Sequence, residues 1–321
     1  MVITRRDSFR AAVAAATLLR ARLGLASASQ PATPLNFDVP PNACDCHTHI
    51  FGDTLRFPLW PGRTYTPQSA SPSEMSQLHR ALHMRRVVIV NPSIYGTDNS
   101  ATLFGMKARG DDARGVAVID GTTPDSDLDA LAQRGIRAIR INVTNAGSAG
   151  LSSMRQRFQA AIKRVQGRNW HIEMNTTPAV ISGIRDLVQS SPVPVVFDHF
   201  GGAQAALGVH QPGFADLAAL VHSGQAYVKI SAPYRCSTQP DYADVKPLAQ
   251  MLIAANADRI IWGSDWPHPN GTPQAGHKNT DVTPLLQIDD GRVLNLLAVW
   301  APDAAVRKKI LVDNPARLYG F

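Results

Sequence analysis

The chain has 321 residues, of which 44% are hydrophobic, enough for one large α/β domain or two smaller ones. Its 3 cysteines are too few, and odd in number, for a disulfide framework. The first 28 residues hold five arginines and one aspartate, so they supply +4 of the formal net charge of +7. Residues 29–321 carry the remaining +3. They contain no basic run with interleaved aromatic residues, which argues against a nucleic-acid partner.

Residues 1–28 have the pattern of an export signal. A basic start, "TRRDSFR", is followed by the apolar run "AAVAAATLL" and by "ASA" at 26–28. The paired Arg5 and Arg6 indicate the twin-arginine type and hence a periplasmic location. Two later arginines interrupt the apolar run, so an uncleaved arm on a cytoplasmic protein is the alternative. No window approaches the ~20 apolar residues that a membrane span requires.

Beyond a proline-rich linker at 29–42, strand-like and helix-like segments alternate. The expected strands are short runs rich in valine and isoleucine, which is typical of buried parallel strands. They are "ACDCHTHI", "RVVIVNPS", "GVAVID", "AIRIN", "WHIEMN", "VPVVFDHF", "AYVKIS" and "RIIWGSD". Residues 71–84 between them have apolar positions at helical spacing. Residues 122–135 predict a second helix, with Thr123 as its cap, Pro124 in its first turn and Gly135 after its end.

Regular alternation of strands and helices from residue 43 to residue 321 predicts one (β/α)8 TIM barrel. A doubly wound open sheet is the alternative, although no glycine-rich phosphate loop follows an early strand. Active sites of such barrels lie at the carboxyl ends of the strands. The polar residues expected there, in chain order, are His47, His49, Ser93, Asp120, Arg140, Asn142, Asn175, Asp198, His199, Lys229, Ser231 and Asp265.

The first strand carries two histidines and two cysteines. Because side chains alternate along a strand, Asp45, His47 and His49 are expected on one face, and Cys44 and Cys46 on the other, packed outward as small apolar groups. Neighbours at i and i+2 are also poorly placed for a disulfide. The histidine pair is therefore the functional half of the motif, either as hydrogen-bond donors or as metal ligands.

Asp265 in "WGSDWPHPN" is the best candidate for a general base. Trp266 and two prolines follow it, and we expect them to desolvate the carboxylate and raise its pKa. His199 in "FDHFGG" is expected to join His47 and His49 around it. These four residues form the predicted catalytic set.

Arginines on two strands suggest an anionic substrate, because the guanidinium fork matches a carboxylate. Arg140 on the fourth strand and Arg235 in "SAPYRC" after the seventh are the candidates. Further hydrogen bonds to the substrate are expected from Ser93, Tyr65, His268 and Asn270.

The motifs "DCHTHIFG", "RTYTP", "VFDHFGG", "YVKIS" and "WGSDWPHP" together resemble the amidohydrolase-related family (amidohydrolase 2). Within it the chain is most similar to the 2-pyrone-4,6-dicarboxylate lactonases and the galactarolactone isomerases, from about residue 40 to the final "DNPARLYGF". The resemblance implies a (β/α)8 barrel that opens a lactone ester without a metal. Asp265 would then activate water, and His47, His49 and His199 would polarise the ester carbonyl.

The chain departs from two patterns in this family. Metal-dependent members add a lysine or glutamate on strand four and a histidine at the end of strand five, whereas strand five here ends in Asn175 and has His171 near its start. No cofactor is therefore expected; the alternative is one divalent cation such as zinc, held by His47, His49 and Asp265. The pyrone dicarboxylate lactonases also carry an arginine and a tyrosine where this chain reads "NVTNAGSAG" and "EMNTT". A less charged lactone or enol ester therefore fits better.

The sequence predicts a hydrolase that opens the ester of a carboxylated lactone. The enzyme alternatives are a sugar-acid lactone isomerase and a hydrolase or decarboxylase with a single metal ion. A serine hydrolase is poorly supported because no G-x-S-x-G occurs. A non-catalytic, exported lactone-binding protein is the alternative from another class, and the intact set of histidines and aspartate argues against it. The sequence does not fix the oligomeric state.

Overall fold

The computed structural model describes residues 28–143, 148–271, 276 and 278–321. The predicted export signal at 1–28 lies almost wholly outside these residues and stays a prediction. Within the described part, no helix is both long enough and apolar enough to cross a membrane.

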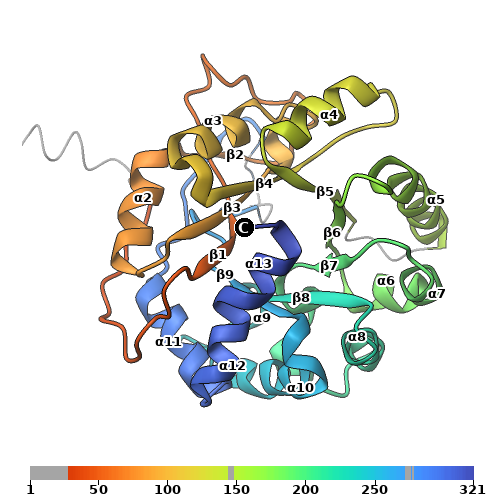
Figure 1. Ribbon diagram of the computed structural model, residues 1–321. Helices are drawn as coiled ribbons and strands as arrows, with labels where there is room; N and C mark the ends of the chain where they lie inside the picture. Colours follow the sequence, from red (N-terminus) through yellow and green to blue (C-terminus); the bar gives the residue numbers. More distant parts are fainter. Residues whose placement is uncertain (1–27, 144–147, 272–275, 277) are drawn as a thin grey trace, which may run out of the picture.

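Eight parallel strands form the centre of the molecule (Figure 1). Each strand pairs with the next one along the chain, in the order β1-β3-β4-β5-β6-β7-β8-β9. The strands are β1 (Cys44–Thr48), β3 (Arg86–Val90), β4 (Ala113–Ala117), β5 (Ile136–Asn142), β6 (His171–Asn175), β7 (Val195–Phe197), β8 (Ala226–Ser231) and β9 (Ile260–Gly263). All eight predicted strands are therefore confirmed, and the barrel prediction with them.

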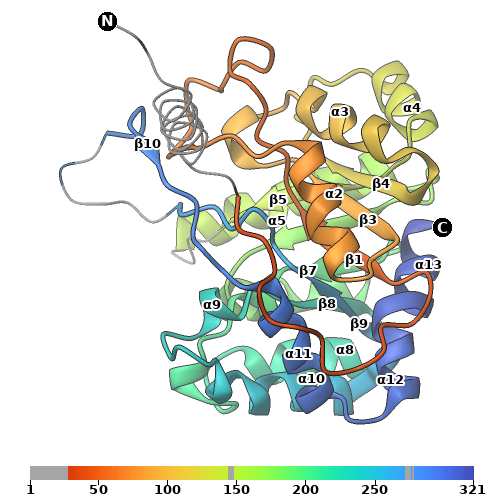
Figure 2. The same cartoon turned by 90° about the vertical axis from the view of Figure 1, so that its left-hand side faces the viewer.

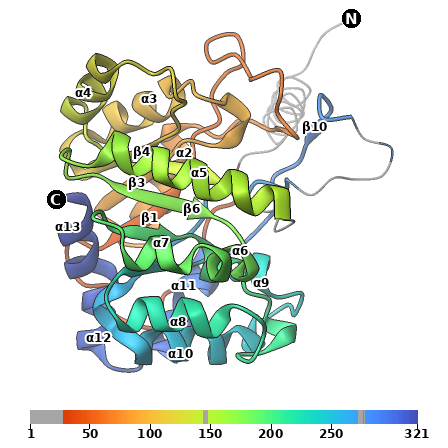
Figure 3. The ribbon, with the colours of Figure 1, turned by 90° about the vertical axis from the view of Figure 1, so that its right-hand side faces the viewer.

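Helices surround the barrel on its outer side (Figures 1 and 3). They are α2 (Pro72–Ala81), α3 (Ser100–Arg109), α4 (Asp125–Gln133), α5 (Ser148–Val165), α6 (Pro178–Gly183), α7 (Arg185–Gln189), α8 (Phe214–His222), α9 (Pro233–Cys236), α10 (Lys246–Asn256), α11 (Asp290–Trp300), α12 (Ala304–Lys308) and α13 (Asn314–Tyr319). A small parallel pair, β2 (Thr66–Pro67) and β10 (Val282–Thr283), lies outside the barrel.

Two helices can be compared with the boundaries expected from the sequence. The helix expected over 71–84 is α2, whose Ser71 and Glu74 form a reciprocal capping box. The helix expected over 122–135 is α4, but its predicted cap, Thr123, is wrong. Pro124 occupies the N-cap position without a side-chain bond. The Thr123 hydroxyl instead donates to Asp120 Oδ1 at 3.2 Å, within the turn before the helix.

The interior of the barrel is closed at its amino-terminal end by α13. Leu318 and Tyr319 of this helix join an apolar cluster with residues from seven strands: Cys44, Cys46, Val88, Val90, Val116, Ala138, Val196, Tyr227 and Ile261. Figure 2 shows α13 at one end of the barrel and β10 beyond the other. Among the described residues, this apolar cluster therefore fills the amino-terminal end of the barrel interior.

The outward packing predicted for Cys44 and Cys46 is wrong, because both thiols lie in this interior cluster. The register between β1 and β3 shifts between Asp45 and Thr48, and this irregularity breaks the simple alternation of side chains. Asp45 points outward, where its Oδ2 accepts from the Ser264 hydroxyl at 2.6 Å. Cys46 and His47 both face the interior as a result. The cysteines are free, as expected.

Strands β1 and β9 meet at their carboxyl ends and close the barrel there. Asp265 N–H donates to the His47 carbonyl at 2.8 Å, and His49 N–H donates to the Trp266 carbonyl at 2.8 Å. We call this pair of hydrogen bonds the β1–β9 seam. It joins the backbone of His47 to that of Asp265, the predicted general base, and the backbone of His49 to that of Trp266, the next residue.

The predicted linker, residues 29–42, is bound to the barrel domain by hydrogen bonds. The Trp266 indole donates to the Ser29 carbonyl at 3.1 Å, and the Thr33 hydroxyl donates to Asp289 Oδ2 at 2.5 Å. This segment therefore packs against the loop after β9 and the start of α11.

Candidate active site

A cavity of about 470 Å³ opens at the carboxyl ends of the strands. Its wall contains three of the four predicted catalytic residues and four of the six predicted binding residues. The lining residues are His49, Thr64, Tyr65, Pro92, Ser93, Arg140, Asn142, Val143, Asn175, His199, Arg235, Asp265, Pro269 and Gly271. His47 is fully buried and is not among them, so it lies beneath the cavity wall.

Asp265 is the centre of the site. It follows β9 in left-handed backbone, with φ at 65°, and its side chain is fully buried. Oδ1 lies 3.5 Å from His47 Nε2, 3.3 Å from His49 Nε2 and 3.9 Å from His199 Nε2. Among the described residues, none forms a hydrogen bond with Oδ1. The structure thus brings the predicted catalytic set together around one unpaired acceptor.

The other oxygen of Asp265 is held firmly. Oδ2 accepts from the Tyr234 hydroxyl at 2.6 Å and from Arg235 Nε at 2.6 Å. Both donors come from α9, directly after β8. Burial alone would raise the pKa of Asp265, but the Arg235 guanidinium, with His199, outweighs it and holds the pKa well below its ordinary value. The raised pKa expected from desolvation is therefore wrong.

The second ring nitrogen of each histidine has a different partner. His49 Nδ1 lies 2.8 Å from the Val90 carbonyl, and His199 Nδ1 lies 2.8 Å from the Ser231 hydroxyl. His47 Nδ1 lies 3.0 Å from Lys229 Nζ. Burial lowers the pKa of His199 to about 3, so this ring is neutral near pH 7. Burial and Lys229 also lower the pKa of His47 well below its ordinary value.

A buried cluster of two cations and two carboxylates lies beneath His47. Lys229 Nζ pairs with Glu173 Oε2 at 2.6 Å and with Asp198 Oδ1 at 3.3 Å. Arg140 donates two hydrogen bonds to Asp198 Oδ2, from Nε at 3.0 Å and from Nη2 at 2.9 Å. Burial opposes ionisation of Asp198, yet Lys229 outweighs it and lowers the pKa of this carboxyl well below its ordinary value. Burial and Asp198 raise the pKa of Glu173 to about 8.

The remaining predicted binding residues divide into two groups. Tyr65 lines the cavity and forms a hydrogen bond with Ser93, and burial raises the pKa of Tyr65 to about 12. His268 is fully buried outside the cavity wall, where its Nε2 lies 2.8 Å from Asp290 Oδ2 and its Nδ1 lies 3.4 Å from the Tyr234 hydroxyl. It therefore contacts the group that holds Asp265. Asn270 lies between two cavity residues, Pro269 and Gly271.

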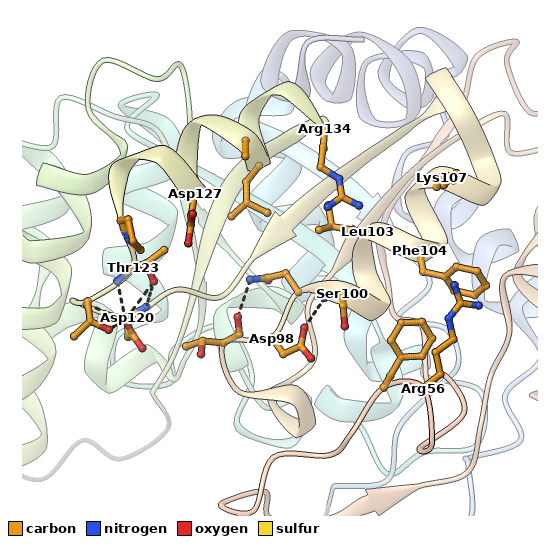
Figure 4. A pocket seen from close by; sticks show the side chains of 17 residues that line it. Arg56, Asp98, Ser100, Leu103, Phe104, Lys107, Asp120, Thr123, Asp127 and Arg134 are labelled. Carbon is orange, nitrogen blue, oxygen red and sulfur yellow. Dashed lines mark hydrogen bonds between the residues drawn. The ribbon is translucent and has the colours of Figure 1, made fainter.

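Asp120, expected at the same rim, follows the carboxyl end of β4 but does not line this cavity. Its Oδ1 accepts from the backbone N–H groups of Thr122 and Thr123 and closes a turn. The surrounding cavity, of about 770 Å³, runs between α3 and α4 (Figure 4). Arg56 lies over the Phe104 ring in its wall, at 4.2 Å from the ring centre. This second cavity contains none of the histidines and is separate from the strand-end site.

Sequence reasoning missed two residues of the site. Glu173 was visible as a carboxylate in the middle of the apolar run "WHIEMN", where a buried strand rarely carries an unpaired charge. Tyr234 directly precedes Arg235, and no local pattern indicated that its hydroxyl would reach a residue 31 positions later.

Two groups of side chains have the spacing of metal ligands: His47, His49 and Asp265, and His47, Asp198 and His199. The distances of 3.5 and 3.3 Å from Asp265 Oδ1 to the two imidazole nitrogens are close to the edge of a zinc tetrahedron, about 3.3 Å for bonds of about 2.0 Å. The Lys229 ammonium counts against both groups, because it lies 3.0 Å from one nitrogen of His47 and 3.3 Å from Asp198. The spacing of the first group therefore suits zinc, whereas the neighbouring ammonium opposes a cation in either group.

Gly263 is the residue that lets β1 and β9 approach each other. A Cβ at this position would lie 2.7 Å from His47 Cβ and 2.8 Å from His47 N. We expect Gly263→Ala to displace His47, to lower stability by about 1–3 kcal/mol and to abolish most activity. Thermal unfolding and steady-state kinetics measure the two effects. Gly121→Ala is the control, because a Cβ there meets nothing within 4 Å. Equal behaviour of the two variants would contradict this role for Gly263.

A parallel barrel that gathers histidines and one aspartate at the carboxyl ends of its first, sixth and eighth barrel strands has the architecture of a hydrolase. The chain belongs to the amidohydrolase family, whose model matches residues 44–321. It is an enzyme of that class.

Three curated relatives cover most of the chain. It is 35% identical over 289 residues to a 4-sulfomuconolactone hydrolase of Rhizobium radiobacter, covering 89% of this chain and 93% of the relative. It is 32% identical to a 2-pyrone-4,6-dicarboxylate hydrolase of Comamonas testosteroni, covering 91% and 94%. It is 28% identical to a D-galactarolactone isomerase of Agrobacterium fabrum, covering 87% and 91%.

Among solved structures, an apo protein of Agrobacterium tumefaciens is 27% identical with a TM-score of 0.73, over 90% of this chain and 99% of that one. A Burkholderia multivorans amidohydrolase solved with bound zinc is 17% identical with a TM-score of 0.60, over 87% and 99%. At that identity the likeness shows the fold alone.

Proposed function

We propose that this protein hydrolyses the ester of a carboxylated lactone, with Asp265 activating the attacking water. The observation that carries the proposal is the unpaired Oδ1 of Asp265. This buried acceptor belongs to a carboxylate that is ionised near pH 7, and it lies at the wall of a cavity that two arginines also line. An ionised acceptor in reach of a bound water is what general-base catalysis requires.

The histidines have different roles in this proposal. The Val90 carbonyl can only accept, so His49 carries a proton on Nδ1, and neutral His49 offers a lone pair at Nε2. His49 Nε2 lies 3.3 Å from Asp265 Oδ1. A water molecule between the two can therefore direct one proton to Asp265 Oδ1 and the other to His49 Nε2. His199 lines the cavity and is placed to polarise the ester carbonyl through Nε2. His47 lies beneath the cavity wall, and from there it stabilises the negative charge that develops on the carbonyl oxygen.

The arginines define the substrate class. Asp265 holds Nε of Arg235, and Nη2 donates to the Pro269 carbonyl at a long 3.4 Å. The side chain is still 35% exposed, so the guanidinium has further donors to offer an anion. Arg140 is 6% exposed and is largely committed to Asp198. One strong anion site and one weaker one suit a lactone with a single carboxylate or sulfonate near the ring. The relatives that act on lactones support this class.

The experiment is a panel of five- and six-membered lactones that carry one or two anionic groups, assayed with the full chain before and after exhaustive chelation. We expect ester opening that survives chelation and is fastest with one anion. Activity that disappears on chelation and returns with one divalent ion would overturn the metal-free mechanism.

Isomerisation of a sugar-acid lactone is the second candidate, because one relative is named for it. It would use the same acid–base and carbonyl-polarising groups. Product analysis in water labelled with oxygen-18 separates the two reactions, since hydrolysis incorporates one solvent oxygen and isomerisation of an intact lactone ring incorporates none.

A further inference from the structure

We propose that Lys229 is a positioning residue, which fixes the proton of His47 on Nε2 and thereby prevents His47 from acting as a metal ligand. The Lys229 Nζ lies 3.0 Å from His47 Nδ1, and both side chains are fully buried. An ammonium group has donors and no acceptor. A neutral imidazole that accepts at Nδ1 must carry its proton on Nε2.

Competing partners of His47 do not reverse this assignment. Asp198 Oδ1 lies 3.2 Å from the same Nδ1 and would accept a proton from it. A proton on Nδ1, however, would face the Lys229 hydrogen at 3.0 Å. Arg140 satisfies Asp198 Oδ2, and although Oδ1 has no hydrogen bond among the described residues, the Lys229 ammonium lies 3.3 Å from it and offers it a charge. The ammonium therefore decides which nitrogen keeps the proton.

This assignment has a chemical consequence at Asp265. The first candidate ligand group needs a lone pair on His47 Nε2, but Lys229 leaves a proton there. The second group needs His47 Nδ1, which Lys229 already occupies. The spacing of these side chains suits zinc, yet this tautomer places a proton and not a lone pair on His47 Nε2, 3.5 Å from Asp265 Oδ1. Lys229 thus selects proton chemistry over metal chemistry in a site that could accommodate either.

The test starts with the unaltered full chain labelled with 15N-histidine. Two-bond correlations in an NMR spectrum show which ring nitrogen carries the proton, and the signal missing from His47→Gln identifies the residue. We expect His47 to be protonated on Nε2. A proton on Nδ1 in the wild-type protein would overturn the proposal, and this measurement needs no variant of Lys229.

The second arm uses the double variant Lys229→Met/Glu173→Gln, which removes the ammonium together with the acid group that pairs with it at 2.6 Å, so that Glu173 is not left as a buried acid without its partner. We expect His47 to move its proton to Nδ1, with Asp198 as acceptor, and the variant to bind one zinc ion per chain by elemental analysis after dialysis. Glu173→Gln alone keeps Lys229, so its His47 tautomer and lack of zinc should match the wild type. Equal zinc binding by wild type and double variant would contradict the inference.

Kinetics give a third readout, and only this one rests on the proposed function. We expect the double variant to lose about 10- to 100-fold in kcat with little change in KM, as is typical when a group that orients a site residue is removed. If no lactone is opened by the wild type, the proposed function fails, while the NMR and zinc measurements still decide the role of Lys229.

Discussion

Asp265→Asn should lower kcat by about 10²- to 10⁴-fold while leaving ligand binding nearly unchanged. An amide cannot take a proton from water, so the general base is lost. The fold should tolerate the change, because the amide oxygen can accept the two hydrogen bonds that Tyr234 and Arg235 donate to Oδ2. The amide N–H group then takes the place of Oδ1 and can donate toward His49 Nε2, 3.3 Å away.

Steady-state kinetics, calorimetric binding of the best lactone and thermal unfolding measure these three effects. Asp186→Asn is the matched control, since this exposed carboxylate pairs with Arg155 far from the cavity. Turnover by Asp265→Asn within about tenfold of the wild type would exclude Asp265 as the base.

Arg235→Gln should lower kcat/KM for an anionic lactone by about 10- to 100-fold and should change the pH profile. In the wild type, Arg235 is the largest influence that keeps the pKa of Asp265 low against the effect of burial. The base must be ionised, so activity is lost as the pH falls through the pKa of Asp265. In the wild type this loss of activity occurs at a pH well below the range in which carboxylates ordinarily titrate. Without Arg235 the effect of burial dominates, the pKa rises, and the acid limb moves to higher pH.

A pH series of kcat/KM tests this, with one anionic and one neutral lactone. The upward shift of the acid limb should occur with both substrates, and the larger loss in affinity only with the anionic one. Arg155→Gln removes a surface ion pair and serves as the control. An unchanged acid limb in Arg235→Gln would mean that Asp265 is not the group that titrates.

The strands and the barrel were predictable because each strand is a short, buried run of branched-chain residues. Such a run can be recognised from its own residues, without knowledge of its partners in the fold. The faces of β1 were not, because the alternation rule fails where the register with β3 shifts at Asp45. The bonds that stabilise the shift come from Ser264, 219 residues further on. Local patterns cannot contain that partner.

The gathering of the three histidines and Asp265 was predictable from the strand ends, whereas the electrostatics of this group were not. Desolvation of Asp265 is visible in its tryptophan and proline neighbours, and it does act on the pKa in the expected direction. The opposing charge comes from Arg235 in a different loop, which sequence reasoning assigned to the substrate alone. The buried Lys229 and Glu173 pair likewise depends on two strands that are neighbours of β7 but not of each other.

The β1–β9 seam means that the site forms only when the first and last strands of the barrel have met. His47 and Asp265 are 218 positions apart and share a backbone hydrogen bond, so Asp265 Oδ1, the oxygen that we propose activates water, is in place only when the two ends of the sheet have met. A nascent chain that stops before β9 holds all three histidines and has no base. Turnover therefore reports whether the barrel has closed. A partly synthesised or nicked chain that retains most of its helices but lacks the β1–β9 seam should show no activity.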